Sequence, residues 1–182
     1  MTARLDANKT LLAVIDVQGA LAEAMSGREA LYANLEKLIR GCQLLNLPMV
    51  WTEQVPDKLG ATIPRIASLL KGQDPIPKSC FSCASDQRFA KALSSAGKAQ
   101  ILLCGIEAHI CVLQTAMDLV ERKYQVFVVA DAVSSREASN VQVALERMRE
   151  VGAVVVSAEM ALFEMLKDAT DPRFRDLLRI IK

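Results

Sequence analysis

A cysteine stands where a buried apolar run gives way to a helical pattern. The stretch ILLCGIEAHICV ends its apolar run at Gly105, and Cys111 then opens the pattern CVLQTAMDLVERK. Unpaired backbone N–H groups and the positive end of the helix dipole gather at a helix start. That environment favours the thiolate, which is the nucleophilic form of cysteine. Cys111 is therefore a candidate nucleophile.

Two side chains of complementary chemistry also follow predicted strands. Asp16 ends the first apolar run, and Lys78 lies in the short segment PIPKSCF. In open parallel sheets ligands bind beyond the carboxyl ends of the strands, so we expect both side chains near Cys111. A lysine ammonium lowers the pKa of a neighbouring thiol, and a carboxylate accepts the thiol proton and later returns it to a leaving group. Each residue alone has an ordinary interpretation as a cap, a surface charge or a packing residue, but together they predict covalent attack on a carbonyl.

Short apolar runs alternate with longer helical patterns along the chain. Their near-continuous apolar character predicts strands buried on both faces. These strands cover residues 11–17, 48–53, 99–105, 125–131 and 153–159, and PIPKSCF is the candidate for a sixth. Apolar residues at three- and four-residue spacing predict helices over 29–46, 86–97, 111–123 and 139–152. The repeated alternation predicts one doubly wound α/β domain over residues 1–182.

Composition narrows the classes of function. Lys plus Arg is 22 and Asp plus Glu is 21, the formal net charge is +1, and aromatics are 4%, so nucleic acid is not an expected partner. No apolar stretch approaches the roughly 18 residues of a membrane span. The N-terminus MTARLDANKT has no hydrophobic signal region, so we expect no membrane association and a cytoplasmic location. Five cysteines in that compartment are expected to be reduced and mostly buried.

The order Asp16, Lys78, Cys111 resembles the isochorismatase-like, or cysteine hydrolase, superfamily over almost the whole chain. The motifs DVQ, TEQVPDKLG, KSCFSC, LCGIEAHICV and DAVSSR are most similar to isochorismatase domain-containing proteins and related small bacterial hydrolases. The resemblance implies a three-layer, Rossmann-like α/β/α fold with a parallel six-stranded sheet in the order 3-2-1-4-5-6. It implies that Cys111 is the nucleophile, Asp16 the general acid and base, and Lys78 the group that holds the thiolate. It also implies a cis peptide between Ile106 and Glu107 that aims an N–H group at the oxyanion.

Residues beside the predicted strand ends are expected to line a pocket for a small-molecule substrate. They are Gln18, Trp51, Gln54, Phe81 and His109. Ordinary core or rim packing is the alternative for each. Superfamily nicotinamidases carry a metal site with an Asp and two His, whereas this chain has one His, and its single C-x-x-C, Cys80 and Cys83, lacks a second pair. We expect neither a metal nor another cofactor.

The leading hypothesis is a metal-independent cysteine hydrolase that acts on a small amide-like substrate through an acyl-enzyme and forms a homo-oligomer, a dimer or larger. One alternative is a catalytically silent binding or scaffold oligomer of the same fold. Another is a thiol redox sensor, which requires a second thiol with its Cα atom within about 7 Å of that of Cys111. The sequence does not decide the substrate, the oligomer size or the packing of the amphipathic segment 171–182.

Overall fold

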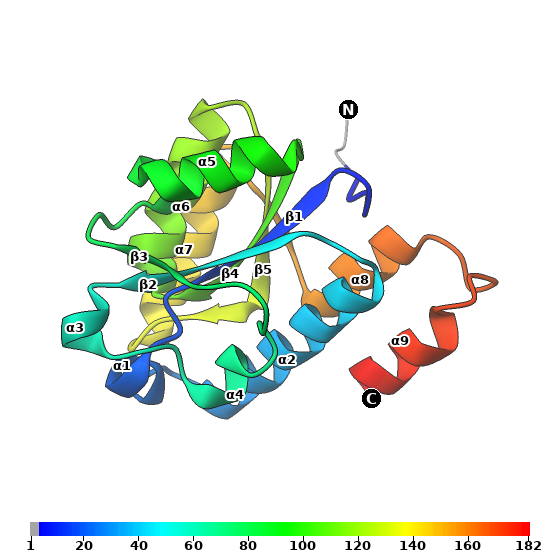
Figure 1. The fold of residues 1–182 in the computed structure, drawn as a ribbon, viewed down its shortest axis with the longest axis horizontal. Helices are drawn as coiled ribbons and strands as arrows, with labels where there is room; N and C mark the ends of the chain where they lie inside the picture. The colour runs from blue at the N-terminus through cyan, green and yellow to red at the C-terminus, as the bar shows by residue number, and fades with distance from the viewer. Residues whose placement is uncertain (1–3) are drawn as a thin grey trace.

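The computed structural model describes residues 4–182, which form a six-stranded parallel sheet with helices on both faces (Figure 1). The strands lie in the order β3-β2-β1-β4-β5-β6. This confirms the three-layer α/β/α fold and the strand order that the resemblance implied. Residues 1–3, the start of the predicted domain and of the N-terminal segment, lie outside the described part of the chain.

The strands are β1 (Thr10–Ile15), β2 (Met49–Gln54), β3 (Ile76–Lys78), β4 (Gln100–Ile106), β5 (Gln125–Ser134) and β6 (Val154–Val156). The helices are α1 (Gly19–Glu23), α2 (Arg28–Leu44), α3 (Pro56–Leu59), α4 (Pro64–Ala67), α5 (Gln87–Ala96), α6 (Leu113–Glu121), α7 (Ala138–Glu150), α8 (Ala158–Leu166) and α9 (Phe174–Ile181). Two short turns complete the list, the 3-10 turn η1 (Cys83–Ser85) and the π-helical turn η2 (Ala108–Val112).

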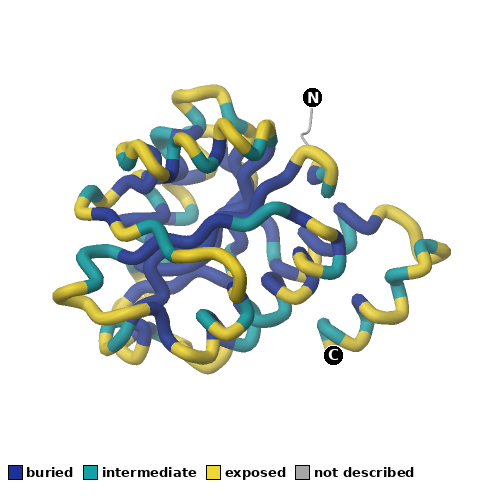
Figure 2. The backbone as a smooth tube through the Cα atoms, viewed as in Figure 1, coloured by how far each residue is buried: buried dark blue, intermediate teal, exposed yellow. Residues whose placement is uncertain are grey.

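Alternate residues of β1 enter two apolar clusters on opposite faces of the sheet. Leu12 and Val14 belong to the cluster with α2, α8 and α9, whereas Leu11, Ala13 and Ile15 belong to the cluster with α5, α6 and α7. Figure 2 shows the buried strands between helices whose outer surfaces are exposed. Because both faces of the sheet are covered, its strands appear in the sequence as continuous apolar runs.

Several element boundaries differ from the sequence prediction, among them the end of β5, which runs to Ser134 instead of residue 131, and two of the differences affect the candidate site. The helix predicted to begin at Cys111 begins earlier, with η2, so the cysteine lies inside a helical turn rather than at its first residue. The strand predicted over 11–17 ends at Ile15, because Asp16 adopts a left-handed backbone conformation with φ of 51°. That change of direction turns the Asp16 side chain out of the strand's alternation.

The C-terminal part of the chain also differs from the prediction. The strand predicted over 153–159 ends at Val156, because the Ser157 side chain accepts a hydrogen bond from the Met160 N–H group and caps α8. Helix α9 then packs on its own chain beside α2 (Figure 1), with Leu177 fully buried.

Within residues 4–182, none of the helices has the length and apolar character needed to cross a membrane.

Candidate active site

Three side chains converge at the carboxyl edge of the sheet. Asp16 follows β1, Lys78 is the last residue of β3, and Cys111 follows β4 inside η2. The Lys78 Nζ atom donates a hydrogen bond to Asp16 Oδ2 at 2.6 Å, and both side chains are almost fully buried. The Cys111 thiol is 7% exposed and lies close enough to Asp16 and Lys78 for both charges to act on its pKa. The structure therefore brings the predicted triad together around Asp16.

The Lys78 ammonium has an acceptor for each of its three protons. Besides Asp16, it donates to Gln54 Oε1 at 2.6 Å and to the Cys80 carbonyl oxygen at 3.2 Å. An ammonium group has three donors and no acceptor, so these contacts satisfy it. Lys78 is thus a fixed positive charge beside the carboxylate.

The protonation of the resting thiol differs from the sequence expectation. Burial raises the pKa of Cys111 well above its ordinary value, the charge of Asp16 raises it further, and Lys78 opposes both. Burial of the sulfur thus outweighs the lysine, which was expected from the sequence to lower the pKa of the thiol. Burial alone would lower the pKa of Lys78, but the acidic groups of Cys83 and Asp16 outweigh burial and raise it. The site therefore holds a neutral thiol, a carboxylate positioned to take its proton, and an ammonium.

The turn before the nucleophile depends on a close approach of two strands. Gly105 has φ of 114°, and a Cβ atom there would lie 2.1 Å from the Ile15 carbonyl oxygen. The next peptide bond, Ile106–Glu107, is cis, as the resemblance implied. The buried Glu107 carboxylate accepts hydrogen bonds from the backbone N–H and the Nε of Arg136, both at 3.1 Å. Glu107 thereby ties the turn to the end of β5.

Two of the predicted pocket residues use their amide groups inside the protein. Gln18 Oε1 accepts from the Gln54 N–H group at 2.6 Å, and Gln18 Nε2 donates to the carbonyls of Gln54 and Gly60. Gln54 Nε2 donates to the Ser79 carbonyl, while its Oε1 accepts from Lys78. These bonds join the ends of β1, β2 and β3. Gln18 and Gln54 thus act as a framework around Lys78, a role the sequence did not reveal.

The other three predicted pocket residues have different surroundings. Trp51 packs in the apolar cluster beside α2, and its indole N–H donates to a backbone carbonyl, so core packing accounts for its position. Phe81 places its carbonyl 3.4 Å from Lys78 Nζ and leaves its side chain 54% exposed. His109 Nδ1 lies 2.9 Å from Ser135 Oγ, and the ring is half-buried. Substrate contacts of Phe81 and His109 stay a prediction.

Two residues to which the sequence assigned no role at the site lie directly behind Asp16. The Thr52 hydroxyl donates to Asp16 Oδ1 at 2.7 Å and lies 3.6 Å from Cys83 Sγ. Both residues are buried. Side chains alternate along a strand, so Thr52 faces away from the cluster that holds Trp51. This alternation along the strand was the feature of the sequence from which the position of Thr52 could have been predicted.

The part of the chain that the structure describes contains no cluster of metal-binding side chains. Between residues 4 and 182, no three His, Cys, Asp or Glu side chains gather in a group that could hold a metal ion. The five cysteines are all free. The site is thus built from one thiol, one carboxylate and one ammonium.

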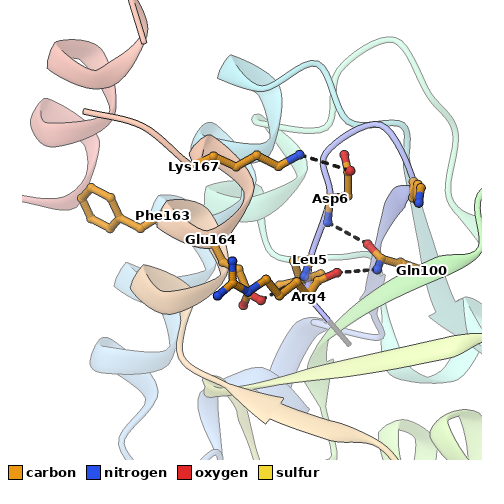
Figure 3. A pocket seen from close by; sticks show the side chains of 8 residues that line it. Arg4, Leu5, Asp6, Gln100, Phe163, Glu164 and Lys167 are labelled. Carbon is orange, nitrogen blue, oxygen red and sulfur yellow. Dashed lines mark hydrogen bonds and ion pairs between the residues drawn. The ribbon is translucent and has the colours of Figure 1, made fainter. Parts of the chain in front are cut away.

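A hollow of about 770 Å³ lies at the opposite edge of the sheet, beside the N-terminal segment (Figure 3). The Gln100 side chain accepts from the Asp6 N–H group and donates to the Arg4 carbonyl. Lys167 pairs with the Asp6 carboxylate at 3.2 Å, and Glu164 accepts from a backbone N–H group of the same segment. These polar groups anchor the N-terminal segment, and none belongs to the triad.

Comparisons with known proteins identify a family and structures with the same fold. The isochorismatase domain model matches residues 10–160. Isochorismatase domain-containing protein 2 from Danio rerio is 33% identical over 178 residues, which cover 98% of this chain and 89% of the relative. The structure of MAR1 ribonuclease from Caenorhabditis elegans has a TM-score of 0.91 and 32% identity, covering 98% of this chain and 92% of that one. YcaC from Escherichia coli, described as an octameric hydrolase of unknown specificity, has a TM-score of 0.90 at 22% identity, covering 98% and 96%, which shows the shared fold.

Proposed function

The chain belongs to the isochorismatase domain family, and from this premise we propose that it is a metal-independent cysteine hydrolase of small amide-like substrates. The observation that carries the proposal is the contact of one buried carboxylate with both a thiol and an ammonium. Asp16 meets Lys78 at 2.6 Å, and its charge acts on the neighbouring Cys111 thiol. A nucleophile, a base and a compensating charge within hydrogen-bond reach are the parts that covalent catalysis needs.

In the first half of the reaction, the Cys111 sulfur bonds to the substrate carbonyl carbon while its proton passes to Asp16. The charge of Lys78 stabilises the sulfur as it becomes anionic. Backbone N–H groups of the turn Gly105–Ala108 and of η2 stabilise the carbonyl oxygen as it becomes an oxyanion. Asp16 then gives its proton to the leaving nitrogen, the C–N bond breaks, and an acyl thioester stays on Cys111.

In the second half, water resolves the thioester. Asp16 accepts a proton from the attacking water, the tetrahedral intermediate collapses, and the C–S bond breaks. The same proton returns to the sulfur, so Cys111 is again a neutral thiol. Cys111 rests as a neutral thiol because its sulfur is buried. The thiolate forms only during the attack on the carbonyl carbon, so it need not be stable at rest.

The names of two similar proteins bear on the assembly and the substrate. YcaC is described as an octamer, which supports our proposal that this chain also forms a homo-oligomer. The Caenorhabditis elegans protein is named a ribonuclease. Here the formal net charge of +1 and the 4% aromatic content offer little for a phosphate backbone or stacked bases, so RNA enters the test as a competing substrate.

The test is ammonia release from a panel of small primary amides and N-carbamoyl compounds. Wild type, Cys111→Ala and the matched control Cys42→Ala are compared, because Cys42 is buried in the cluster on the other face of the sheet. We expect turnover of at least one compound, a loss of about a thousandfold or more in Cys111→Ala, and activity in the control. Full activity in Cys111→Ala excludes covalent catalysis. Failure of the whole panel favours the silent binding protein, and Cys111-dependent cleavage of RNA overturns the substrate class.

A further inference from the structure

The hydrogen bonds behind Asp16 have a defined direction. An ionised carboxylate only accepts, so the single hydroxyl proton of Thr52 points to Asp16 Oδ1, 2.7 Å away. The Thr52 oxygen is then left as an acceptor for the Cys83 sulfur at 3.6 Å. The donor in that contact is the Cys83 thiol. The result is a chain that runs from Cys83 through Thr52 to the base.

Both donors of this chain are held rigidly. Thr52 lies in β2 with β1 on one side and β3 on the other, and it is 1% exposed. The Cys83 backbone N–H donates to Thr115 Oγ1 at 2.9 Å, which fastens η1 to α6. Burial raises the pKa of the Cys83 thiol to about 11, so it keeps the proton that it donates.

The two oxygens of Asp16 are held from opposite sides. Lys78 binds Oδ2 and Thr52 binds Oδ1, so rotation of the carboxylate about its terminal torsion, which is otherwise soft, breaks one bond or the other. A hydrogen bond to a carboxylate also stabilises its anionic form. We propose that Thr52, with Cys83 behind it, is a positioning residue that fixes the plane of the Asp16 carboxylate for proton transfer from Cys111. The inference deepens the proposed function and rests on it.

The titratable groups that face Asp16 come from three elements. They are Lys78 from β3, Cys83 from η1 and Cys111 from η2. Lys78 and Cys83 keep their protons at neutral and acidic pH because their pKa values are raised. Neither group therefore contributes to the acid side of a pH profile measured at Cys111.

The test measures alkylation of Cys111 by iodoacetamide from about pH 4 to about pH 9, with peptide mapping by mass spectrometry. Thr52→Val keeps the shape of the side chain and removes its donor, so the acid limb of the profile moves upward by about 1 to 2 pH units. Thr52→Ser keeps the hydroxyl and rescues the wild-type profile. Cys83→Ala moves the limb the same way by a smaller amount, because it weakens the bond only indirectly. Thr10→Val, a buried threonine at the far end of β1, leaves the profile unchanged.

Two results overturn the inference while Cys111 stays selectively reactive. One is a Thr52→Val profile that overlays wild type, and the other is a Thr52→Ser profile displaced as far as that of valine. If Thr52→Val does not fold, an undisplaced limb in Cys83→Ala decides against the chain. A wild-type Cys111 that reacts no faster than the other cysteines at every pH overturns the proposed function itself, which separates the two failures.

Discussion

Asp16 is the residue on which the site depends. Its carboxylate meets an ammonium, a hydroxyl and a thiol that arrive from β3, β2 and η2. Buried charges persist in proteins when they are paired and hydrogen-bonded, and here Lys78 supplies the pairing. Breaking the Asp16–Lys78 pair is therefore expected to reduce the stability of the fold as well as to impair the chemistry.

Replacing Lys78 by Met removes the ammonium and keeps most of the stem. Because Asp16 is then a buried, unpaired charge, we expect the free energy of unfolding to fall by about 3–5 kcal/mol. Alkylation of Cys111 near neutral pH slows about tenfold or more, because the sulfur loses the cation that stabilises it as it becomes anionic. Urea unfolding and peptide-mapped labelling measure the two effects. The double variant Asp16→Asn, Lys78→Met should lose less stability than the sum of the single variants, and strict additivity contradicts direct coupling.

The sequence predicted the triad because residue type and position at a strand end are both readable from it. It did not predict the raised pKa of Cys111, because the degree of burial depends on the packing of α5, α6 and α7 over the thiol. The hydrogen bonds of Gln18 and Gln54 were equally hidden, since an amide binds whichever backbone groups the fold places near it. The residues that could do chemistry were thus identifiable from the sequence, whereas their hydrogen-bond partners were not.

At the scale of elements, the junction of β4 with η2 delivers the nucleophile. Continuous apolar runs predicted the long strands because helices cover both faces of the sheet. The start of the helix was misplaced because η2 is a π-helical turn, whose five-residue spacing gives no period of 3.6. The sheet order came from the resemblance of the motifs rather than from the apolar pattern.

Gly105→Ala tests this junction. The new Cβ meets the Ile15 backbone at 2.1 Å and stands on φ of 114°, so we expect a loss of more than about 3 kcal/mol in the free energy of unfolding. Gly97→Ala is the matched control, since its φ is 60° and no atom lies within 4 Å of the new Cβ. Its cost should be about 1 kcal/mol. Denaturant unfolding of both proteins decides, and equal losses contradict the close approach of β4 to β1.

At the scale of the molecule, one sheet separates two apolar clusters, and the triad lies at its carboxyl edge. The C-terminal helix α9 covers α2 of its own chain. Four buried thiols lie within the two clusters, those of Cys42, Cys83, Cys104 and Cys111. They make stability sensitive to alkaline pH.

Burial raises the pKa of each of these four thiols above the ordinary value of 9.0. At a pH below 9.0 the thiols are protonated in both the folded and the unfolded chain, so they do not reduce the stability. Above that pH the unfolded chain releases protons that the folded chain keeps, so each thiol costs about 1.4 kcal/mol per pH unit as the pH rises toward the folded pKa. Thermal unfolding from about pH 7 to about pH 10.5 should show a melting temperature that falls steeply above about pH 9. Cys42→Ala should make the fall less steep, and a flat profile contradicts burial of the thiols.

Assembly is tested by light scattering during size-exclusion chromatography. A homo-oligomer gives a mass that is a whole multiple of 19.9 kDa, and it holds that mass on dilution into the low micromolar range. We expect a dimer or a larger oligomer. A single species at the mass of one chain contradicts this proposal and leaves the account of the triad intact.

Transfer of the acyl group to Cys111 is the step on which the proposed function depends. Its most direct test is to mix the protein with a small activated ester, quench with acid and map the acylated peptides by mass spectrometry, with Cys111→Ser as control. We predict one acyl group per chain, on the peptide that contains Cys111, as a thioester that hydroxylamine releases and that the variant does not form. Acyl groups spread over surface lysines and Cys80, with Cys111 unmodified, would contradict the account.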